Sequence, residues 1–265
     1  TDGAGVKLVR VLGNLTTKEF DPILMLDSFD SINPDDYTAG FPMHPHRGIE
    51  TISYVSRGKM VHRDSLGNEA GISDGEVQWM NSGSGIMHEE MVPAAERLLG
   101  VQLWLNLPAK DKMSKPSYNS IKNADIKEIE IEGGKIRLLA GKYGEHEGYK
   151  GDYLSMDYYD IHLNADAEVT LTMEEDDSVM VFTLLGDVYI DGEHIEEKTA
   201  VKLTEGDSLT IKNGNEKAQV LYMNSRALNE PVAWAGPIVM NTQEELQKAF
   251  LELRSNTFIK ETAEY

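Results

Sequence analysis

The sequence of 265 residues contains no cysteine. This absence excludes disulfide bonds, thiolate nucleophiles and cysteine-ligated zinc or iron–sulfur sites, so any bound metal must be held by His, Asp or Glu. The chain also lacks an apolar run long enough to span a membrane, and its first residues do not follow the basic-then-apolar pattern of a signal peptide. We therefore expect a cytoplasmic protein that does not bind membranes.

Basic residues are few. The 25 Lys and Arg residues stand against 45 Asp and Glu residues, which gives a net charge of −20. Binding to a nucleic-acid backbone needs a basic face that neutralises phosphates, so direct nucleic-acid binding is not expected. Apolar residues make up 40% of the chain, enough to bury a core without a metal or a disulfide. We expect a globular protein that is a monomer.

Short strands separated by turns dominate the sequence pattern. Gly, Asn and Asp recur at intervals of roughly ten residues, which is typical of β-sandwiches and β-barrels. The clearest predicted strands cover residues 49–55, 76–80, 99–105, 136–139, 169–173, 178–185, 187–190 and 208–211. One helix is predicted over residues 242–254, where Thr242 offers an N-cap and apolar residues recur every three or four positions.

Two similar β domains are predicted, because the same order of elements recurs in both halves. Residues 55–77 and 184–209 each read as a strand, a glycine turn, a strand and then an acidic glycine turn into a further strand. The polar, turn-rich segment 108–125 is the expected connection between them. We therefore predict a first domain over residues 1–125 and a second domain over residues 126–265, which includes the helix.

The first of two histidine clusters contains His44 and His46. Side chains two positions apart in a strand point to the same face, so the two imidazoles are predicted to lie side by side, and Glu50 has the same parity. Neutral imidazole is a good ligand for Fe, Cu, Ni, Zn and Co, so the pair is a half-site for a divalent metal. The alternative is a pair of partly exposed histidines in a turn, which we would favour for an isolated pair.

The second cluster places His88 and Glu90 on one face of another strand, and the alternative here is a solvated charged edge. A small β-barrel brings strands that are distant in sequence side by side, so both clusters are expected to converge on one interior. Three imidazoles and one carboxylate would be costly to bury without partners, and a metal removes that cost. Such a set leaves two exchangeable positions of an octahedron open for chemistry.

Six strings of the sequence resemble the pirin family in their order and spacing. They are FDPILMLD (20–27), GFPMHPHRGIET (40–51), QWM (78–80), GIMHEEM (85–91), QLWLN (102–106) and GPIVMNTQEE (236–245). The resemblance spans nearly the whole chain. It implies an all-β bicupin, with two tandem cupin (jelly-roll) β-barrels and a C-terminal helix that packs on the N-terminal barrel. It also implies that only the N-terminal barrel holds a metal.

The resemblance further implies the ligands. Carried over to this sequence, they are His44, His46, His88 and Glu90, around one divalent ion that is expected to be Fe(II). Such a site also accepts Mn, Co, Ni, Cu or Zn. The wider cupin pattern takes its carboxylate from the first motif, so Glu50 is the alternative ligand. We expect Glu90 to be the ligand and Glu50 to support the site from outside the ligand set or to have a structural role.

Residues on the strands beside these motifs are the candidate pocket. They are Phe41, Met60, Trp79, Gln102 and Trp104, and for the two tryptophans a position in the core is an equally good interpretation. His62 follows the first cluster after a hairpin. It is a candidate for the pocket mouth, and we expect it to have no ligand role. The second half has only scattered histidines, each expected on the surface or packed singly.

The resemblance implies a metal-dependent dioxygenase similar to quercetin 2,3-dioxygenases, which opens flavonols with O2 and releases carbon monoxide and a depside. In this hypothesis Glu90 is the catalytic general base, Phe41 and Trp104 stack on the flat substrate, and Gln102 hydrogen-bonds it. The alternative is a non-enzymatic iron-binding regulator of a protein partner, either a transcription factor or a metabolic enzyme. A third interpretation is a metal site for another small aromatic or enolic metabolite.

Overall fold

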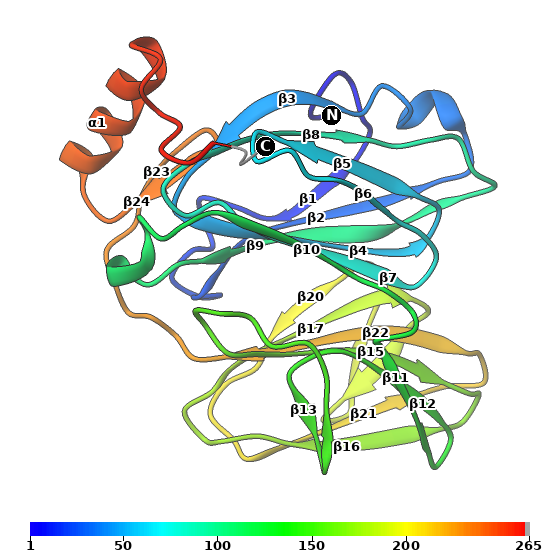
Figure 1. Cartoon of the computed structure of the whole chain (residues 1–265). Coiled ribbons are helices and arrows are strands. Elements are labelled where there is room, and N and C mark those ends of the chain that lie inside the picture. Colours follow the sequence, from blue (N-terminus) through cyan, green and yellow to red (C-terminus); the bar gives the residue numbers. More distant parts are fainter. Residues whose placement is uncertain (263–265) are drawn as a thin grey trace. The chain divides into compact units, whose positions relative to one another are not determined.

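The computed structural model describes residues 1–262, in which the chain divides into two compact units. The first unit comprises residues 1–18, residues 23–122 and the chain from Leu228 onward, and the second comprises residues 19–22 and 123–227. Both units consist of strands joined by turns, and Figure 1 shows a single long helix near the end of the chain. The predicted all-β architecture of two cupin barrels is confirmed.

The first unit contains two sheets, which Figure 1 shows as separate layers. The six-stranded sheet has the order β1-β2-β9-β4-β7-β10, and the four-stranded sheet has the order β3-β8-β5-β6. Their strands are β1 (Val9–Leu12), β2 (Ile23–Ser31), β3 (Phe41–His46), β4 (Ile49–Arg57), β5 (Met60–Asp64), β6 (Glu69–Ile72), β7 (Glu76–Asn81), β8 (Ile86–Met91), β9 (Leu98–Asn106) and β10 (Ser117–Ile121). Two short 3-10 turns, Pro34–Asp36 and Ala109–Asp111, lie in the connections.

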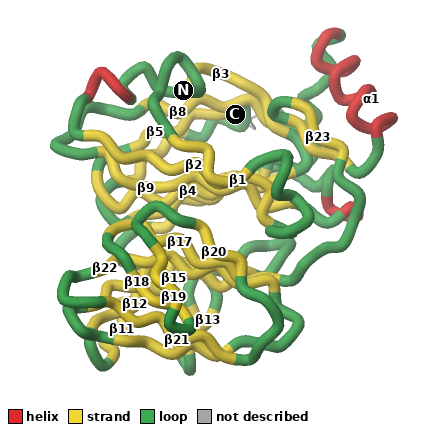
Figure 2. Tube along the Cα trace, turned by 180° about the vertical axis from the view of Figure 1, so that it is seen from behind, coloured by secondary structure: helices red, strands yellow, loops and turns green. Residues whose placement is uncertain are grey.

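The second unit repeats this plan with a six-stranded sheet, a four-stranded sheet and a short hairpin. Its sheets have the orders β11-β12-β15-β22-β17-β20 and β16-β21-β18-β19, and the hairpin joins β13 to β14. The strands are β11 (Lys127–Ile131), β12 (Gly134–Ala140), β13 (Lys142–Tyr143), β14 (His146–Glu147), β15 (Met156–Leu163), β16 (Glu168–Thr172), β17 (Ser178–Leu185), β18 (Val188–Ile190), β19 (Glu193–Ile195), β20 (Ala200–Lys202), β21 (Ser208–Asn213) and β22 (Ala218–Ser225). Figure 2 shows from behind how strands dominate both units.

The C-terminal segment forms a hairpin, β23 (Ala233–Ala235) and β24 (Ile238–Met240), followed by the helix α1 (Gln243–Arg254). Thr242 caps the helix and exchanges two hydrogen bonds with Glu245 in a capping box, which satisfies amide groups that the first turn leaves without partners. The helix packs through Leu246 and Ala249 onto the hairpin. The predicted helix and its packing on the N-terminal barrel are confirmed.

The chain from Leu228 onward belongs to the first unit, whereas the sequence interpretation included it in the second domain's range. Arg47 explains this assignment. It is 2% exposed, and its guanidinium donates to the Glu252 carboxylate at 2.8 Å and to the Phe258 carbonyl at 2.9 Å. The backbone amide of Val239 also donates to the Arg47 carbonyl at 3.1 Å. These contacts fasten the C-terminal segment to the turn that follows β3.

The segment 108–125, expected as a connection, contributes a strand to the first unit. Strand β10 pairs with β7 in antiparallel register, with Tyr118 opposite Met80. The division between the units falls after Lys122. The polar composition that indicated a linker reflects an edge strand, since β10 lies at the end of the six-stranded sheet.

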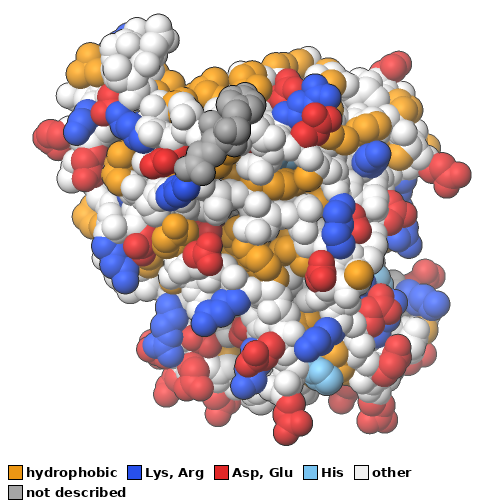
Figure 3. All heavy atoms as spheres, in the orientation of Figure 1, with side chains coloured by type: hydrophobic (Ala, Val, Ile, Leu, Met, Phe, Trp, Pro, Cys, Tyr) orange, Lys and Arg blue, Asp and Glu red, His pale blue; other side chains and the backbone are white. Residues whose placement is uncertain are grey.

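The surface of the molecule has mixed charge. On the face shown in Figure 3, acidic and basic side chains are interspersed, in keeping with a chain that has an excess of acid. None of the helices within residues 1–262 has the length and apolar character that a membrane crossing requires.

Candidate metal centre

Three neighbouring strands of the four-stranded sheet each carry a pair of chemically active side chains two positions apart. The pairs are His44 and His46 on β3, His88 and Glu90 on β8, and His62 and Asp64 on β5. Strand β8 lies between the other two, and its His88 is directly opposite His44 on one side and opposite Asp64 on the other. Because residues i and i+2 share a face of a strand, the sheet presents all three pairs on one face.

The histidines of β3 and β8 form a tight cluster. Ligand nitrogens of His44, His46 and His88 all lie within 4.8 Å of one another. Their ring centroids are 4.3 to 5.0 Å apart. His46 is 3% exposed and His88 is 1% exposed, so most of the cluster is shielded from water. The structure therefore brings together the two histidine motifs that the sequence placed on separate strands.

The hydrogen bonds of these rings leave their Nε2 atoms available. The Nδ1 atom of His44 contacts the Pro42 carbonyl at 2.8 Å, and that of His46 contacts the Pro237 carbonyl at 3.0 Å. A carbonyl only accepts, so Nδ1 carries the proton, and in the neutral rings the Nε2 lone pairs meet at 3.1 Å. The buried Nε2 of His88 has no hydrogen-bond partner among the described residues. A cation satisfies all three nitrogens, and this donor set indicates a single metal ion.

Burial keeps the imidazoles of His46 and His88 in the neutral form that binds metals. It lowers the pKa of His46 to about 3, and the nearby His44 ring, beside which a second positive charge is unfavourable, acts in the same direction. Burial also lowers the pKa of His88 well below its usual value, with His46, His44 and His62 as further causes. At neutral pH these two rings therefore offer lone pairs and carry no competing protons.

Glu90 lies on the same strand face as His88, and its carboxylate is held by two side-chain amides. Its carboxylate accepts from the side-chain amide of Gln78, and its two oxygens accept from the Gln102 amide at 3.1 Å each. Within residues 1–262, the group of ligand atoms close enough to share an ion comprises the three histidines without Glu90. The structure thus assembles three of the four expected ligands, and it places the fourth on an amide clamp formed by Gln78 and Gln102.

Glu50, the alternative ligand, lies elsewhere. It accepts a hydrogen bond from the indole Nε1 of Trp79 at 3.0 Å. Glu50 is three positions from Ser53 on β4, so it points to the face of the sheet opposite Ser53 and the Gln102 that pairs with it. The turn at Gly48, with φ of +81°, separates β3 from β4, so the shared parity of Glu50 and the histidines does not bring them together.

A pocket of about 740 Å³ opens beside the cluster. His44, His46, Glu90 and Gln102 line one part of it, and the aromatic side chains of Phe41, Trp104 and Trp234 line another. The rings of Trp104 and Trp234 lie 5.5 Å apart at an angle of 45°. Of the other candidates, Met60 is buried outside the lining, with its sulfur 3.3 Å from the Gln78 amide, and Trp79 is buried beside Glu50.

A charged group borders the same pocket. The Arg10 guanidinium donates to both carboxylate oxygens of Asp27, at 2.9 and 2.8 Å, and to Asp2 at 2.6 Å. Burial raises the pKa of Asp27, although Arg10 opposes the shift. Two carboxylates around one guanidinium leave this border acidic, so it favours ligand groups that donate hydrogen bonds over anionic groups.

The sequence interpretation missed several residues that support the site. His62, a candidate for the pocket mouth, is instead fully buried and contacts His88. Asp64, two positions later, repeats the spacing of the other two pairs, and that spacing was a readable signal. Nothing local in the sequence indicates Tyr118 or Pro237, because they approach the site from β10 and from the C-terminal segment.

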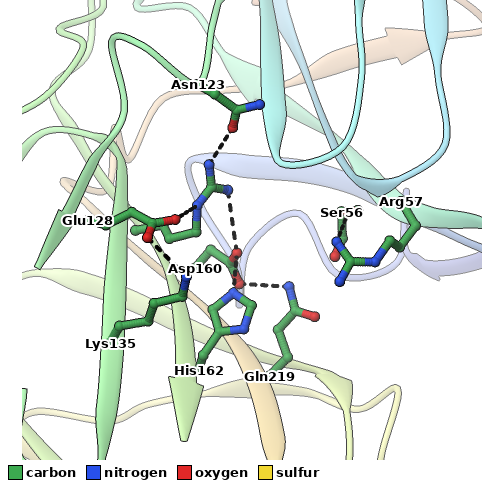
Figure 4. Close-up of polar contacts among 9 residues, drawn as sticks. Ser56, Arg57, Asn123, Glu128, Lys135, Asp160, His162 and Gln219 are labelled. Carbon is green, nitrogen blue, oxygen red and sulfur yellow. Dashed lines mark hydrogen bonds and ion pairs between the residues drawn. The ribbon is translucent and has the colours of Figure 1, made fainter. Parts of the chain in front are cut away.

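The histidines of the second unit are dispersed. His146 is exposed on β14, and His194 contacts Asp187 at 3.0 Å. His162 contacts Asp160 at 2.8 Å, in a network that Figure 4 shows. Across residues 1–262, the first-unit cluster is the only group of three or more His, Asp or Glu side chains arranged to hold one ion.

Comparison with known proteins identifies relatives of the whole chain. The model of the Pirin family matches residues 5–105, and that of the Pirin C-terminal cupin domain matches residues 158–259. A Pseudomonas aeruginosa protein named "Putative quercetin 2,3-dioxygenase" is 39% identical over 96% of this chain and 92% of its own length. Human Pirin is 35% identical over 96% of this chain and 89% of its own length.

A solved structure also resembles this chain closely. The crystal structure of a quercetin 2,3-dioxygenase from Acinetobacter baumannii superposes with a TM-score of 0.88, at 31% sequence identity. The similarity covers 97% of this chain and 93% of that one. It therefore includes both barrels and the C-terminal segment.

Proposed function

The chain belongs to the pirin family, and on this premise we propose that it is a metal-dependent dioxygenase that opens flavonols such as quercetin with O2. The observation that carries the proposal is the pocket, which is lined both by His44 and His46 of the histidine cluster and by the aromatic side chains of Phe41, Trp104 and Trp234. Relatives and a structural neighbour named as quercetin 2,3-dioxygenases support the same activity.

The pocket suits a flat, hydroxylated aromatic substrate. Its volume of about 740 Å³ lies within the range of small-molecule sites. Phe41, Trp104 and Trp234 offer ring faces and edges for stacking. The acidic border around Arg10 favours phenolic hydroxyl groups, which donate hydrogen bonds, and disfavours substrates with carboxylate or sulfate groups.

One divalent ion, which we propose to be Fe(II), would be held by the Nε2 atoms of His44, His46 and His88, with Glu90 as the fourth ligand when it leaves its amide clamp. Bound there, the ion supplies a Lewis acid and a redox partner for O2. The rings themselves are held in place by their Nδ1 contacts, two of which go to backbone carbonyls. Neutral nitrogen donors of this kind suit iron and its first-row neighbours.

Glu90 is the proposed general base. It is 1% exposed, it lines the pocket, and its contacts with Gln78 and Gln102 are all with N–H donors, so its oxygens act as acceptors. In that state the carboxylate takes the proton of the flavonol 3-hydroxyl. The O–O bond of O2 then breaks as one oxygen bonds to C2 and the other to C4 of the flavonol. The bonds from C3 to these two carbons break, C3 leaves with its own oxygen as carbon monoxide, and the proton returns to the depside product.

The test is anaerobic reconstitution with Fe(II), Mn(II), Co(II), Ni(II) or Cu(II), followed by quercetin turnover in air with detection of carbon monoxide. We expect metal-dependent turnover that is lost in His46→Ala. Glu90→Gln should lower turnover by about 100-fold or more, because it removes the base. Stoichiometric metal without turnover for any of the five metals would contradict the proposal and favour the non-enzymatic iron-binding regulator.

A further inference from the structure

The pair on β5 has no place in the expected ligand set, yet its side chains are buried beside the cluster. The side chains of His62 and Asp64 are both fully shielded from solvent. The Nε2 atom of His62 lies 2.8 Å from an oxygen of Asp64, and its Nδ1 atom lies 3.4 Å from Nδ1 of His88. Asp64, His62 and His88 therefore form one continuous line that ends at the histidine cluster.

The donors and acceptors along this line fix the position of each proton. One oxygen of Asp64 accepts from the backbone amides of Leu66 and Asn68, and the other accepts from the Asn68 side chain and from His62. With four donors around it, Asp64 acts as an acceptor throughout, so His62 carries its proton on Nε2. When His88 presents an unprotonated Nε2 to an ion, its own proton lies on Nδ1, from which it donates to the Nδ1 of His62. The contacts of the line are compatible with this arrangement from Asp64 to His88.

We propose that His62 and Asp64 are positioning residues of the metal centre, which hold His88 in the tautomer and orientation that present Nε2 to the ion. The other two proposed ligands, His44 and His46, are oriented by hydrogen bonds from Nδ1 to backbone carbonyls. Only His88 depends on a side-chain line that ends in a carboxylate. Outer hydrogen bonds of this kind orient ligand histidines and raise their basicity. The inference rests on the proposed ligand role of His88 and is independent of the dioxygenase reaction.

Tyr118 ties this line to the clamp on Glu90. Its ring stacks on His62 with centroids 3.9 Å apart and an angle of 11°. Its hydroxyl donates to the Gln78 side-chain carbonyl at 3.4 Å, and Gln78 in turn donates to Glu90. The edge strand β10 therefore holds the His62 ring against rotation while it contacts the group that holds Glu90.

Asp64→Asn is the decisive variant, because it keeps the shape of the side chain and replaces one acceptor oxygen with a donor NH2 group. With its carbonyl oxygen toward the amides of Leu66 and Asn68, the introduced side chain directs an NH2 group at His62. His62 must then accept at Nε2 and donate from Nδ1, which faces the proton on His88. Relief of that conflict moves the His88 proton to Nε2, where it blocks the ion. We expect Co(II) and Fe(II) to bind about 10- to 100-fold more weakly, measured by anaerobic competition with a chromophoric chelator.

A spectroscopic readout separates positioning from general destabilisation. In the Co(II)-loaded wild type, each of the three ligand histidines should give one exchangeable, paramagnetically shifted Nδ1 proton resonance in the NMR spectrum. In Asp64→Asn we expect the resonance of His88 to move or to exchange faster, while those of His44 and His46 stay in place. Unchanged affinity together with an unmoved His88 resonance would overturn the proposal.

The second unit offers a matched control. Asp160 and His162 are also two positions apart on one strand, 2.8 Å from each other, in the network of Figure 4. Asp160→Asn should leave metal affinity within about twofold of wild type, because no histidine cluster adjoins the pair. A loss equal to that of Asp64→Asn would show a non-specific effect and count against the proposal.

A second variant covers the case in which Asp64→Asn does not fold. His62→Phe keeps the ring on Tyr118 and leaves the turn of Asp64 with its backbone donors intact. It removes the acceptor for the His88 proton, so we expect weakened metal binding and faster exchange of that proton. Wild-type affinity in folded His62→Phe would contradict the proposal, whatever the turnover of quercetin.

Discussion

In the first unit His62 contacts Asp64, and in the second unit His162 contacts Asp160, each pair two positions apart on one strand with a separation of 2.8 Å. The two pairs differ in the further contacts that they make. His62 directs its other nitrogen toward His88 of the histidine cluster, whereas Asp160 also receives the Gln219 amide at 2.9 Å in the network of Figure 4. The same two side chains thus acquire their role from the strand next to them.

The interiors of the two units also differ in polarity. The core of the second unit is a continuous cluster of aliphatic and aromatic side chains that includes Ile136, Ile161, Val181 and Val220. In the first unit, the inward face of the six-stranded sheet carries Asp27, Gln102, Ser53 and Gln78 at matching register positions. Two members of this polar row, Asp27 and Gln102, line the pocket.

The sharpest test of this comparison removes one histidine from each unit. His88→Ala deletes one of three converging nitrogens, so we expect the metal content after dialysis to fall below about a tenth of the wild-type value. His162→Ala should retain the wild-type content. Mass spectrometry measures the metal content of both variants. A wild-type metal content in His88→Ala would contradict the proposed ligand set.

Two lysines allow the two units to be compared by the pH dependence of their stability. Lys112 in the first unit is 2% exposed, and its Nζ donates to the Gly48 carbonyl at 2.8 Å and to Asn106 at 2.6 Å. Burial lowers its pKa to about 7 from the ordinary 10.5. Between these values the unfolded chain binds a proton that the folded chain does not, so this lysine makes stability rise with pH from about 7 to 10.5, and the penalty is fully present below 7.

Lys112→Met should remove that slope. We expect the difference in the free energy of unfolding, wild type minus variant, to rise by about 1 kcal/mol per pH unit between about pH 7.5 and 10. Denaturant titrations at three pH values measure the difference. In the second unit, burial also lowers the pKa of Lys202, which is less deeply buried, so Lys202→Met should show a shallower change. Parallel curves for wild type and Lys112→Met would contradict the assignment.

The smallest effect is expected at Glu50. Glu50→Gln keeps an oxygen for the indole of Trp79, so the free energy of unfolding should fall by only about 1 kcal/mol. Its side chain points away from the cluster, so the metal content should equal that of the wild type. Loss of metal in this variant would instead make Glu50 a ligand.

Periodicity made much of the fold predictable. The strands and the single helix follow from turn residues, from alternation and from the Thr242 cap, all of which act over a few neighbouring residues. The histidine pairs were readable for the same reason, because a strand alternates its side chains between two faces. The spacing of His62 and Asp64 carries the same information, since it predicts that these two side chains share a strand face.

Tertiary structure decided the rest. The turn at Gly48 reversed the face expected for Glu50, and the side-chain amides of Gln78 and Gln102 hydrogen-bond the Glu90 carboxylate. Pro237, 191 residues from His46, supplies the carbonyl that orients its ring.

The sequence by itself determined which side chains share a strand face, and therefore the histidine motifs, the strands and the family to which the chain belongs. Only the tertiary structure decided which faces meet, that β10 and the C-terminal segment join the first unit, and that the β5 pair lies against His88. The reason is physical. Alternation is a property of adjacent peptide units, whereas pairing between distant strands depends on loop closure and on the packing of the whole unit.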